Sequence, residues 1–174
     1  WHTAHEAMKK LGLSGRIQRD QHGYLKINLS GTKTRDLSGF SRLPVYSLNL
    51  WQTPVRNLDA LKQMPLRRLS LAYAPVEDLR PLHGRPLQSL TVAYAPVEDL
   101  TPLRGAPLIH LHLSGTKTHD LSPLKDMPLE SLHLDRTSIT DLKPLAGLPL
   151  RELRLDGCEK LKDLTPLAQC TELE

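Results

Sequence analysis

The feature that most constrains the fold of this chain is an internal repeat with a period of 21 residues. The octet AYAPVEDL occurs at residues 72–79 and again at 93–100, and LSGTKT-x-DLS occurs at 29–38 and, four periods later, at 113–122. A fixed period of about 20–50 residues is the signature of a solenoid, in which each unit packs only on its neighbours. Seven units follow one another: 24–44, 45–65, 66–86, 87–107, 108–128, 129–149 and 150–173. The octet is therefore one phase of a structural repeat and not a duplicated active site.

Each unit predicts one short strand and one short turn. The pattern is LxxLxLxxTxVxDLxPLxxxP, and its leucines at the fourth and sixth positions alternate with polar residues, as in a half-buried strand. A chain that returns every 21 residues can start a parallel neighbour, whereas the proline after DL excludes a long helix. Asp or Asn before that proline is a strong N-cap, so we expect a short 3₁₀ or extended return segment. The capping residues are Asp36, Asn57, Asp78, Asp99, Asp120, Asp141 and Asp163.

These motifs resemble the leucine-rich repeat family over residues 24–173. The short DLxPLxxxP segment resembles the bacterial type found in internalins, and LSGTKT-x-DLSPLKDMPL is similar to repeat regions attached to serine/threonine protein kinases of planctomycete-like bacteria. The resemblance implies an α/β solenoid of horseshoe shape, with one parallel sheet on the concave face and 3₁₀ or extended segments on the convex face. One departure concerns the ninth position, where family members often carry asparagine. Here that position holds Thr32, Thr53, Ala74, Ala95, Thr116, Thr137 and Cys158.

Residues 1–23 do not fit the repeat, and we expect them to form an N-terminal helical cap on a solenoid of residues 24–174. Thr3 and Glu6 have the spacing of a capping box, and Ala4, Met8 and Leu11 fall on one helical face. At the other end, Leu173 and Glu174 stand where an eighth strand would begin, so association through this uncapped end is a further expectation.

Composition limits the function classes. The net charge of +4 comes from scattered Lys and Arg, which argues against a nucleic-acid partner. No apolar run approaches the ~20 residues of a membrane span, and Cys158 and Cys170 match no metal-ligand spacing. Two reduced cysteines favour the cytoplasm. Since the chain begins at Trp1 without a methionine, we expect it to be a piece of a longer protein.

Outward side chains of the strands and of the loops that follow them are the candidates for binding. Trp51, Tyr73 and Tyr94 fall on consecutive units at one edge of the sheet, where exposed aromatic residues serve as interface anchors. Alternatively, these rings pack over Pro54, Pro75 and Pro96 and only shield the edge. The fifth-position row adds further candidates: Asn49, Thr91, His112, His133 and Arg154.

A second cluster contains His110, His112 and His133 with Asp135. Two histidines on adjacent strands should lie ~5 Å apart, a spacing that could hold Zn²⁺ or Ni²⁺. Because side chains on a flat sheet diverge, we expect a solvated polar surface and no metal site. A catalytic arrangement of Ser114, His112 and Asp135 is disfavoured for want of a pocket or oxyanion donors.

The leading hypothesis is a non-catalytic module that presents its concave face and its Trp/Tyr edge to a protein or peptide, without a cofactor. The alternative is an accessory domain of a larger enzyme, such as a serine/threonine protein kinase, whose catalytic part lies outside this chain.

Overall fold

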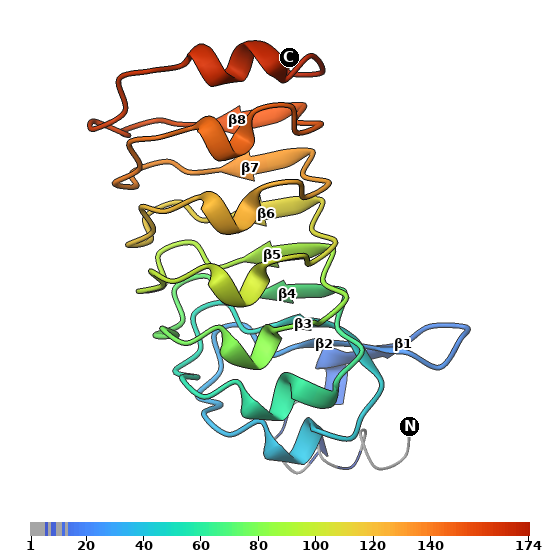
Figure 1. The fold of residues 1–174 in the computed structure, drawn as a ribbon. Helices are drawn as coiled ribbons and strands as arrows, with labels where there is room; N and C mark the ends of the chain where they lie inside the picture. The colour runs from blue at the N-terminus through green and yellow to red at the C-terminus, as the bar shows by residue number, and fades with distance from the viewer. Residues whose placement is uncertain (1–5, 7, 10–11, 13) are drawn as a thin grey trace.

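In the computed structural model, which describes Glu6, Met8, Lys9, Gly12 and residues 14–174, the chain forms a ladder of strands and 3₁₀ turns (Figure 1). The strands of its single eight-stranded sheet, counted over these residues, are β1 (Ile17–Arg19), β2 (Leu25–Asn28), β3 (Val45–Asn49), β4 (Arg68–Ser70), β5 (Ser89–Thr91), β6 (His110–His112), β7 (Ser131–His133) and β8 (Glu152–Arg154). The 3₁₀ turns are η1 (Ser14–Arg16), η2 (Ser38–Phe40), η3 (Asp59–Gln63), η4 (Arg80–Leu82), η5 (Thr101–Leu103), η6 (Ser122–Leu124), η7 (Lys143–Leu145) and η8 (Thr165–Gln169).

Neighbouring units pair their strands in register. From β3 to β8 each residue lies beside the residue one unit later, so that Leu69, Leu90 and Leu111 form one row across the sheet. The predicted parallel sheet with short 3₁₀ return segments is confirmed. No helix in the described part of the chain is long and apolar enough to cross a membrane.

The N-terminal segment, for which a helical cap is predicted, lies only partly in the described residues. The proposed capping box and its apolar face lie mostly outside the described residues, but residues 17–19 form a strand, β1, which pairs antiparallel with β2. Ile17 is buried, and the pairing satisfies backbone groups that the outer edge of β2 would otherwise leave open. The hairpin of β1 and β2 projects from the side of the solenoid (Figure 1).

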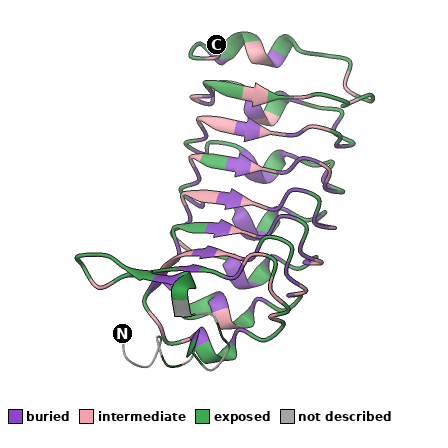
Figure 2. Ribbon diagram, turned by 180° about the vertical axis from the view of Figure 1, so that it is seen from behind, coloured by how far each residue is buried: buried purple, intermediate pink, exposed green. Residues whose placement is uncertain are grey.

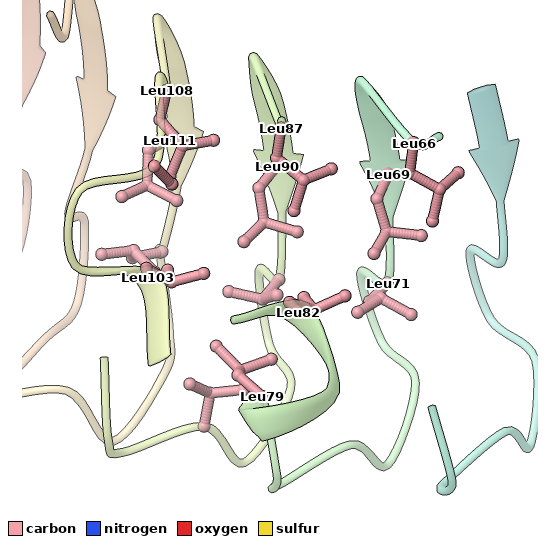
Figure 3. Packing of buried hydrophobic residues seen from close by; sticks show 14 of the residues in the cluster. Leu66, Leu69, Leu71, Leu79, Leu82, Leu87, Leu90, Leu103, Leu108 and Leu111 are labelled. Carbon is pink, nitrogen blue, oxygen red and sulfur yellow. The ribbon is translucent and has the colours of Figure 1, made fainter. Parts of the chain in front are cut away.

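The core is a stack of nearly identical leucine layers between the sheet and the 3₁₀ turns (Figure 2). Leu87 and Leu90 point inward from the strand side of the fourth unit, and Leu82 and Leu103 point inward from the turns of the third and fourth units (Figure 3). All four are at most 1 % exposed. Leucine supplies most of this core, because successive layers present nearly the same shape to each other.

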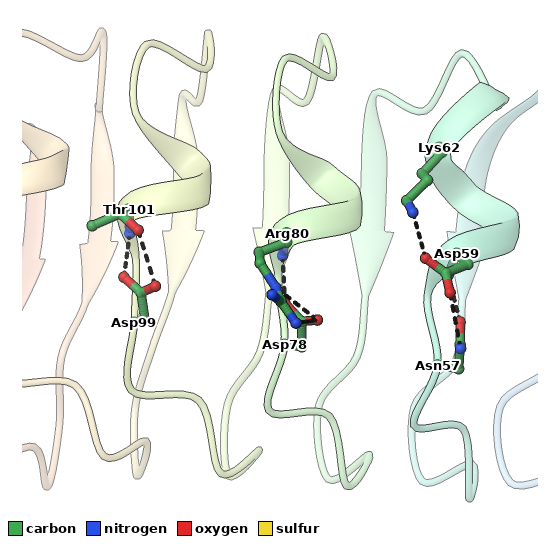
Figure 4. Close-up of polar contacts among 7 residues, drawn as sticks. All are labelled: Asn57, Asp59, Lys62, Asp78, Arg80, Asp99 and Thr101. Atoms are coloured by element: carbon green, nitrogen blue, oxygen red, sulfur yellow. Dashed lines mark hydrogen bonds and ion pairs between the residues drawn. The ribbon is translucent and has the colours of Figure 1, made fainter.

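The Asp or Asn residue before each turn has the capping function that the repeat pattern predicts. Its side-chain oxygen accepts the backbone N–H two residues later in all seven units, at 2.6–2.9 Å (Figure 4). It stands one residue earlier than predicted, since the N-cap itself is a leucine, such as Leu79. The Arg80 side chain and N–H hold the pKa of Asp78 below its usual value, and the Thr101 N–H and hydroxyl do the same for the pKa of Asp99.

At the ninth position, the threonine hydroxyls donate within their own loop, to the carbonyl three residues earlier, at 2.6–2.7 Å. In the units that have alanine there, the same carbonyl accepts the backbone N–H of Ala74 or Ala95, so no carbonyl is left open. Cys158 alone reaches the preceding unit, where its Sγ donates to the Leu134 carbonyl at 3.1 Å. The side chains at the ninth position therefore stabilise their own loops, and they do not form a continuous ladder of hydrogen bonds from unit to unit.

We expect Thr118→Val to raise the free energy of unfolding by about 1 kcal/mol, because it removes a buried hydroxyl that has no partner. Thr118 is 0 % exposed, and its Oγ1 bonds to no group in the described structure. Val76 and Val97 occupy the same place in their units and are equally buried. Urea denaturation of the variant and of the wild type measures the difference.

Thr116→Val is the matched control, since the Thr116 hydroxyl donates to the Leu113 carbonyl at 2.7 Å. Losing that bond should lower stability by about 1 kcal/mol. A shift of the same sign in both variants would refute the assignment of the Thr118 hydroxyl as unpartnered.

The last unit is less well covered than the inner ones. Leu153 and Leu155 in β8 and just after it are only partly buried, and Leu164 is 56 % exposed. The backbone pairing nevertheless continues beyond this unit, because the N–H of Glu174 donates to the Arg151 carbonyl at 3.2 Å, as Arg151 does to Glu130. Association through this end of the solenoid remains a prediction.

Candidate interaction surface

The outward side chains of the strands form straight rows across the sheet. Asn28, Asn49, Ser70, Thr91, His112, His133 and Arg154 lie side by side in strand register, as the 21-residue period predicts. Asn49 is less free than its place suggests, because its Oδ1 accepts the backbone N–H of Trp51 at 3.0 Å. Its role in the structure is thus to hold the backbone of Trp51 in place.

Trp51, Tyr73 and Tyr94 come together as one group, which we call the aromatic strip. The rings of Tyr73 and Tyr94 are stacked, with centroids 4.7 Å apart and planes 15° apart. Trp51 meets Tyr73 edge to face at 6.3 Å. The three side chains remain 40 %, 50 % and 42 % exposed in chain order. The rings therefore support one another while a large apolar area stays in contact with water.

The backbone beneath the two tyrosines is left-handed. Tyr73 and Tyr94 have φ of 59° and 58°, and the residue at the same place in three other units is glycine: Gly31, Gly115 and Gly157. Glycine adopts this conformation freely, whereas another residue loses about 1–2 kcal/mol. An unfavourable backbone conformation kept at an exposed tyrosine points to a use for its side chain.

Gly115 completes the strip on the side of the fifth unit. A Cβ atom added there would lie 2.5 Å from Cδ1 of Tyr94, so the ring of Tyr94 occupies the space that any other residue would fill. Tyr94 is thus packed between Tyr73 and the backbone of Gly115. Ala72 and Ala93, the residues directly before the two tyrosines, are buried.

The histidines form a separate polar patch on β6 and β7. The rings of His112 and His133 lie 4.7 Å apart, which confirms the predicted neighbourhood, and Nε2 of His133 is 3.0 Å from Oε1 of Glu152. Burial, and then the neighbouring His133, lower the pKa of His112. The hydroxyl of Ser131 and then His133 lower the pKa of Glu152.

An aspartate network borders this patch. Asp135 accepts the Ser114 hydroxyl at 3.0 Å and the backbone N–H of Asp156 at 3.0 Å, and Nε of Arg154 lies 3.5 Å from its carboxylate. In a serine–histidine–aspartate triad the histidine would stand between the other two, but here Ser114 bonds directly to Asp135. Over the described residues, no three His, Cys, Asp or Glu side chains are grouped so as to hold a metal ion.

Sequence reasoning missed a third group, on the opposite edge of the sheet, where Tyr24 and Tyr46 meet edge to face and line a cavity. Its signal in the sequence was weak, because Tyr24 and Tyr46 occupy different positions of their units and share no repeated word with each other.

No family model matches the sequence, and no curated protein matches it significantly. Among solved structures, internalin C2 of Listeria monocytogenes is similar, with a TM-score of 0.79 and 29 % identity over 83 % of this chain and 66 % of its own. The internalin inlF of the same organism gives a TM-score of 0.70 and 23 % identity over 86 % of this chain and 58 % of its own. The chain thus spans less than two thirds of the length of these structures. Taken together, the 21-residue period, the parallel sheet with its 3₁₀ turns and the likeness to internalin C2 identify the chain as a leucine-rich repeat solenoid.

Proposed function

We propose that this solenoid is a non-catalytic module that binds a protein or peptide, with the aromatic strip as its main contact. The observation that carries the proposal is the exposure of Tyr73 and Tyr94 on a left-handed backbone, stacked on each other and flanked by Trp51. Exposed Trp and Tyr anchors combine a large apolar area with polar tips, which is the composition of interface hot spots.

The stacking also bears on the class of ligand. A sugar or a nucleobase binds an aromatic side chain through the ring face. Tyr94, however, has one face against Tyr73 and lies over Gly115, so its free parts are the ring edge and the hydroxyl. Ring edges and hydroxyls suit the apolar side chains and the backbone carbonyls of a polypeptide.

The polar part of the surface would then contribute specificity. Thr91 joins the strip to His112 and His133, because the three lie in one row on β5, β6 and β7. A shallow hollow of about 170 Å³ lies over these residues. Beyond it, the guanidinium of Arg154 is half exposed and faces the carboxylates of Asp135 and Asp156. We propose that a bound polypeptide crosses the sheet from the strip towards Arg154.

Peptides selected from a random dodecapeptide library on the immobilised protein test this proposal. Trp51→Ala and Tyr73→Ala should each weaken their binding at least about tenfold, equivalent to 1.4 kcal/mol, as expected for anchor residues. Fluorescence anisotropy of the labelled peptides measures the change, and circular dichroism checks the fold of each variant.

Arg136→Ala is the matched control for Tyr73→Ala. Arg136 is exposed and has the same loop position and left-handed backbone as Tyr73, but it lies outside the strip. Its effect should stay within about twofold, because it lies away from the proposed anchors. Full affinity in both strip variants would exclude the aromatic strip as the binding surface.

A further inference from the structure

A second aromatic site lies at the edge of the sheet opposite the strip. Tyr24 directly precedes β2, and Tyr46 is the second residue of β3, whereas the strip follows the ends of its strands. Together with Pro65 and Pro86 they line a cavity of about 220 Å³, with Asp20 and Arg67 also in its wall. We call this site the tyrosine groove. Two of its lining residues, Asp20 and Tyr24, belong to the turn that joins β1 and β2.

The rings of the groove are arranged differently from those of the strip. Tyr24 and Tyr46 meet at 76° with centroids 6.4 Å apart, and Tyr24 is 44 % exposed. An edge-to-face pair covers one ring face only, so open aromatic faces remain for a ligand. The volume is below the ~300 Å³ at which pockets for drug-sized molecules begin, and it therefore suits one or two side chains of a polypeptide.

Two irregularities of the backbone hold this arrangement in place. The register between β2 and β3 shifts after Leu25, so that Tyr46 is an extra, bulged residue. A bulge re-aims the side chain that it carries. On the other wall, Oδ1 of Asp20 accepts the N–H groups of His22 and Tyr24, each at 2.9 Å, and the Asp20 N–H donates to the Tyr24 carbonyl. Both tyrosines thus stand on fixed backbone.

The walls favour proline as the bound side chain. An extended, proline-rich segment adopts a preformed polyproline II helix and docks into grooves lined by aromatic residues. Its pyrrolidine rings pack on tyrosine faces, and its solvated carbonyls accept bonds from tyrosine hydroxyls. The groove offers both, beside the apolar rings of Pro65 and Pro86.

The charge around the groove favours an acidic ligand. Residues 14–70 contain ten Lys and Arg but three Asp and Glu, whereas residues 71–174 contain eleven and fifteen. At the groove itself, Arg67 and Asp20 are both exposed, and Oδ1 of Asp20 accepts the two N–H groups of its turn, so the excess positive charge comes from the surrounding residues 14–70. Complementary charge steers a partner and fixes its orientation.

We propose that the tyrosine groove binds an extended, proline-bearing segment of an acidic partner protein. This is a site additional to the aromatic strip, and it can be present or absent whether or not the strip binds.

The test is an NMR titration of the ¹⁵N-labelled chain with a synthetic peptide of four Glu-Pro-Pro repeats. Saturable shifts should appear at the amides of Tyr24, Tyr46 and Arg67. Peptides of four Glu-Ala-Ala or four Lys-Pro-Pro repeats should bind at least about tenfold more weakly, since each lacks one feature that the groove recognises.

Two variants make the result specific to the groove. Tyr46→Ala should weaken binding of the Glu-Pro-Pro peptide at least about tenfold, and Arg67→Glu, a change at an exposed site, should remove the preference over the lysine peptide. Tyr94→Ala, in the strip, should leave the affinity unchanged. Absence of saturable shifts at millimolar peptide, equal binding of the lysine peptide, or full affinity in Tyr46→Ala would each overturn the proposal. If Trp51→Ala and Tyr73→Ala have no effect in the library experiment, the proposal for the aromatic strip fails, but the outcome of the titration at the tyrosine groove is not affected.

Discussion

Leu90→Ala is expected to lower the free energy of unfolding by about 2–5 kcal/mol, the largest effect of any single substitution considered for this chain. Leu90 is 1 % exposed in the central unit and lies between Leu69 and Leu111 in the row of the sheet (Figure 3). Truncation leaves a cavity that two neighbouring layers share. Since units of a solenoid are stabilised by contacts with their neighbours, the loss weakens both interfaces of the fourth unit.

Leu153→Ala is the control for this substitution. Leu153 occupies the equivalent position in β8, in the row that continues from Leu111 through Leu132. It is only partly buried and packs against a neighbouring leucine layer on one side. Its truncation should cost about 1–2 kcal/mol, because less apolar area leaves contact with protein. Guanidinium denaturation of both variants measures the difference. Equal losses would contradict a stability set by nearest-neighbour layers.

Much of the fold could be predicted because the repeat relates distant residues by simple arithmetic. Two residues 21 apart occupy equivalent places, so His112 had to lie beside His133, and Asp78 and Asp99 had to cap equivalent turns. The alternation of leucine and polar residues then determines which side chains face the core. These inferences need no knowledge of long-range packing, since the period itself supplies the contacts.

The left-handed loops were predictable in principle, but the sequence alone did not identify them. Glycine at Gly31, Gly115 and Gly157 marks a loop position that requires positive φ, and Tyr73 and Tyr94 share it. From the sequence, the rings could either anchor a partner or pack over the loop prolines and shield the edge of the sheet. Stacking between the tyrosines, and the contact of Tyr94 with Gly115, depend on side-chain rotamers that the repeat does not specify.

The tyrosine groove could not be predicted, because it arises where the repeat is broken. Tyr46 is placed by a bulge, and Tyr24 by a hairpin whose first strand, β1, lies in the segment that the sequence assigned to a helical cap. Neither feature recurs after 21 residues, so no comparison between units reveals it. The two aromatic sites thus have different origins: the repeat builds the strip, and its irregular first units build the groove.

Gly115→Ala is expected to lower the free energy of unfolding by about 2–3 kcal/mol and to weaken binding at the aromatic strip. Part of the loss, about 1–2 kcal/mol, comes from placing a Cβ atom on a left-handed backbone, since φ of Gly115 is +68°. The remainder comes from the ring of Tyr94, whose Cδ1 and Cε1 atoms would lie 2.5 and 2.7 Å from the new Cβ atom. The ring must move, and its stacking on Tyr73 is worth about 0.5–1.5 kcal/mol.

Gly31→Ala separates the two contributions. Gly31 has the same place in the first unit and the same φ of +68°, but no atom lies within 4 Å of the position of its Cβ atom. Its replacement should therefore cost only the backbone term of about 1–2 kcal/mol, with the near-ultraviolet circular dichroism of the tyrosines unchanged. In Gly115→Ala that signal should change together with stability, because the stacked pair is broken. Equal losses of stability and unchanged spectra in both variants would contradict this explanation. The position of the Tyr94 ring would then not require a glycine at residue 115.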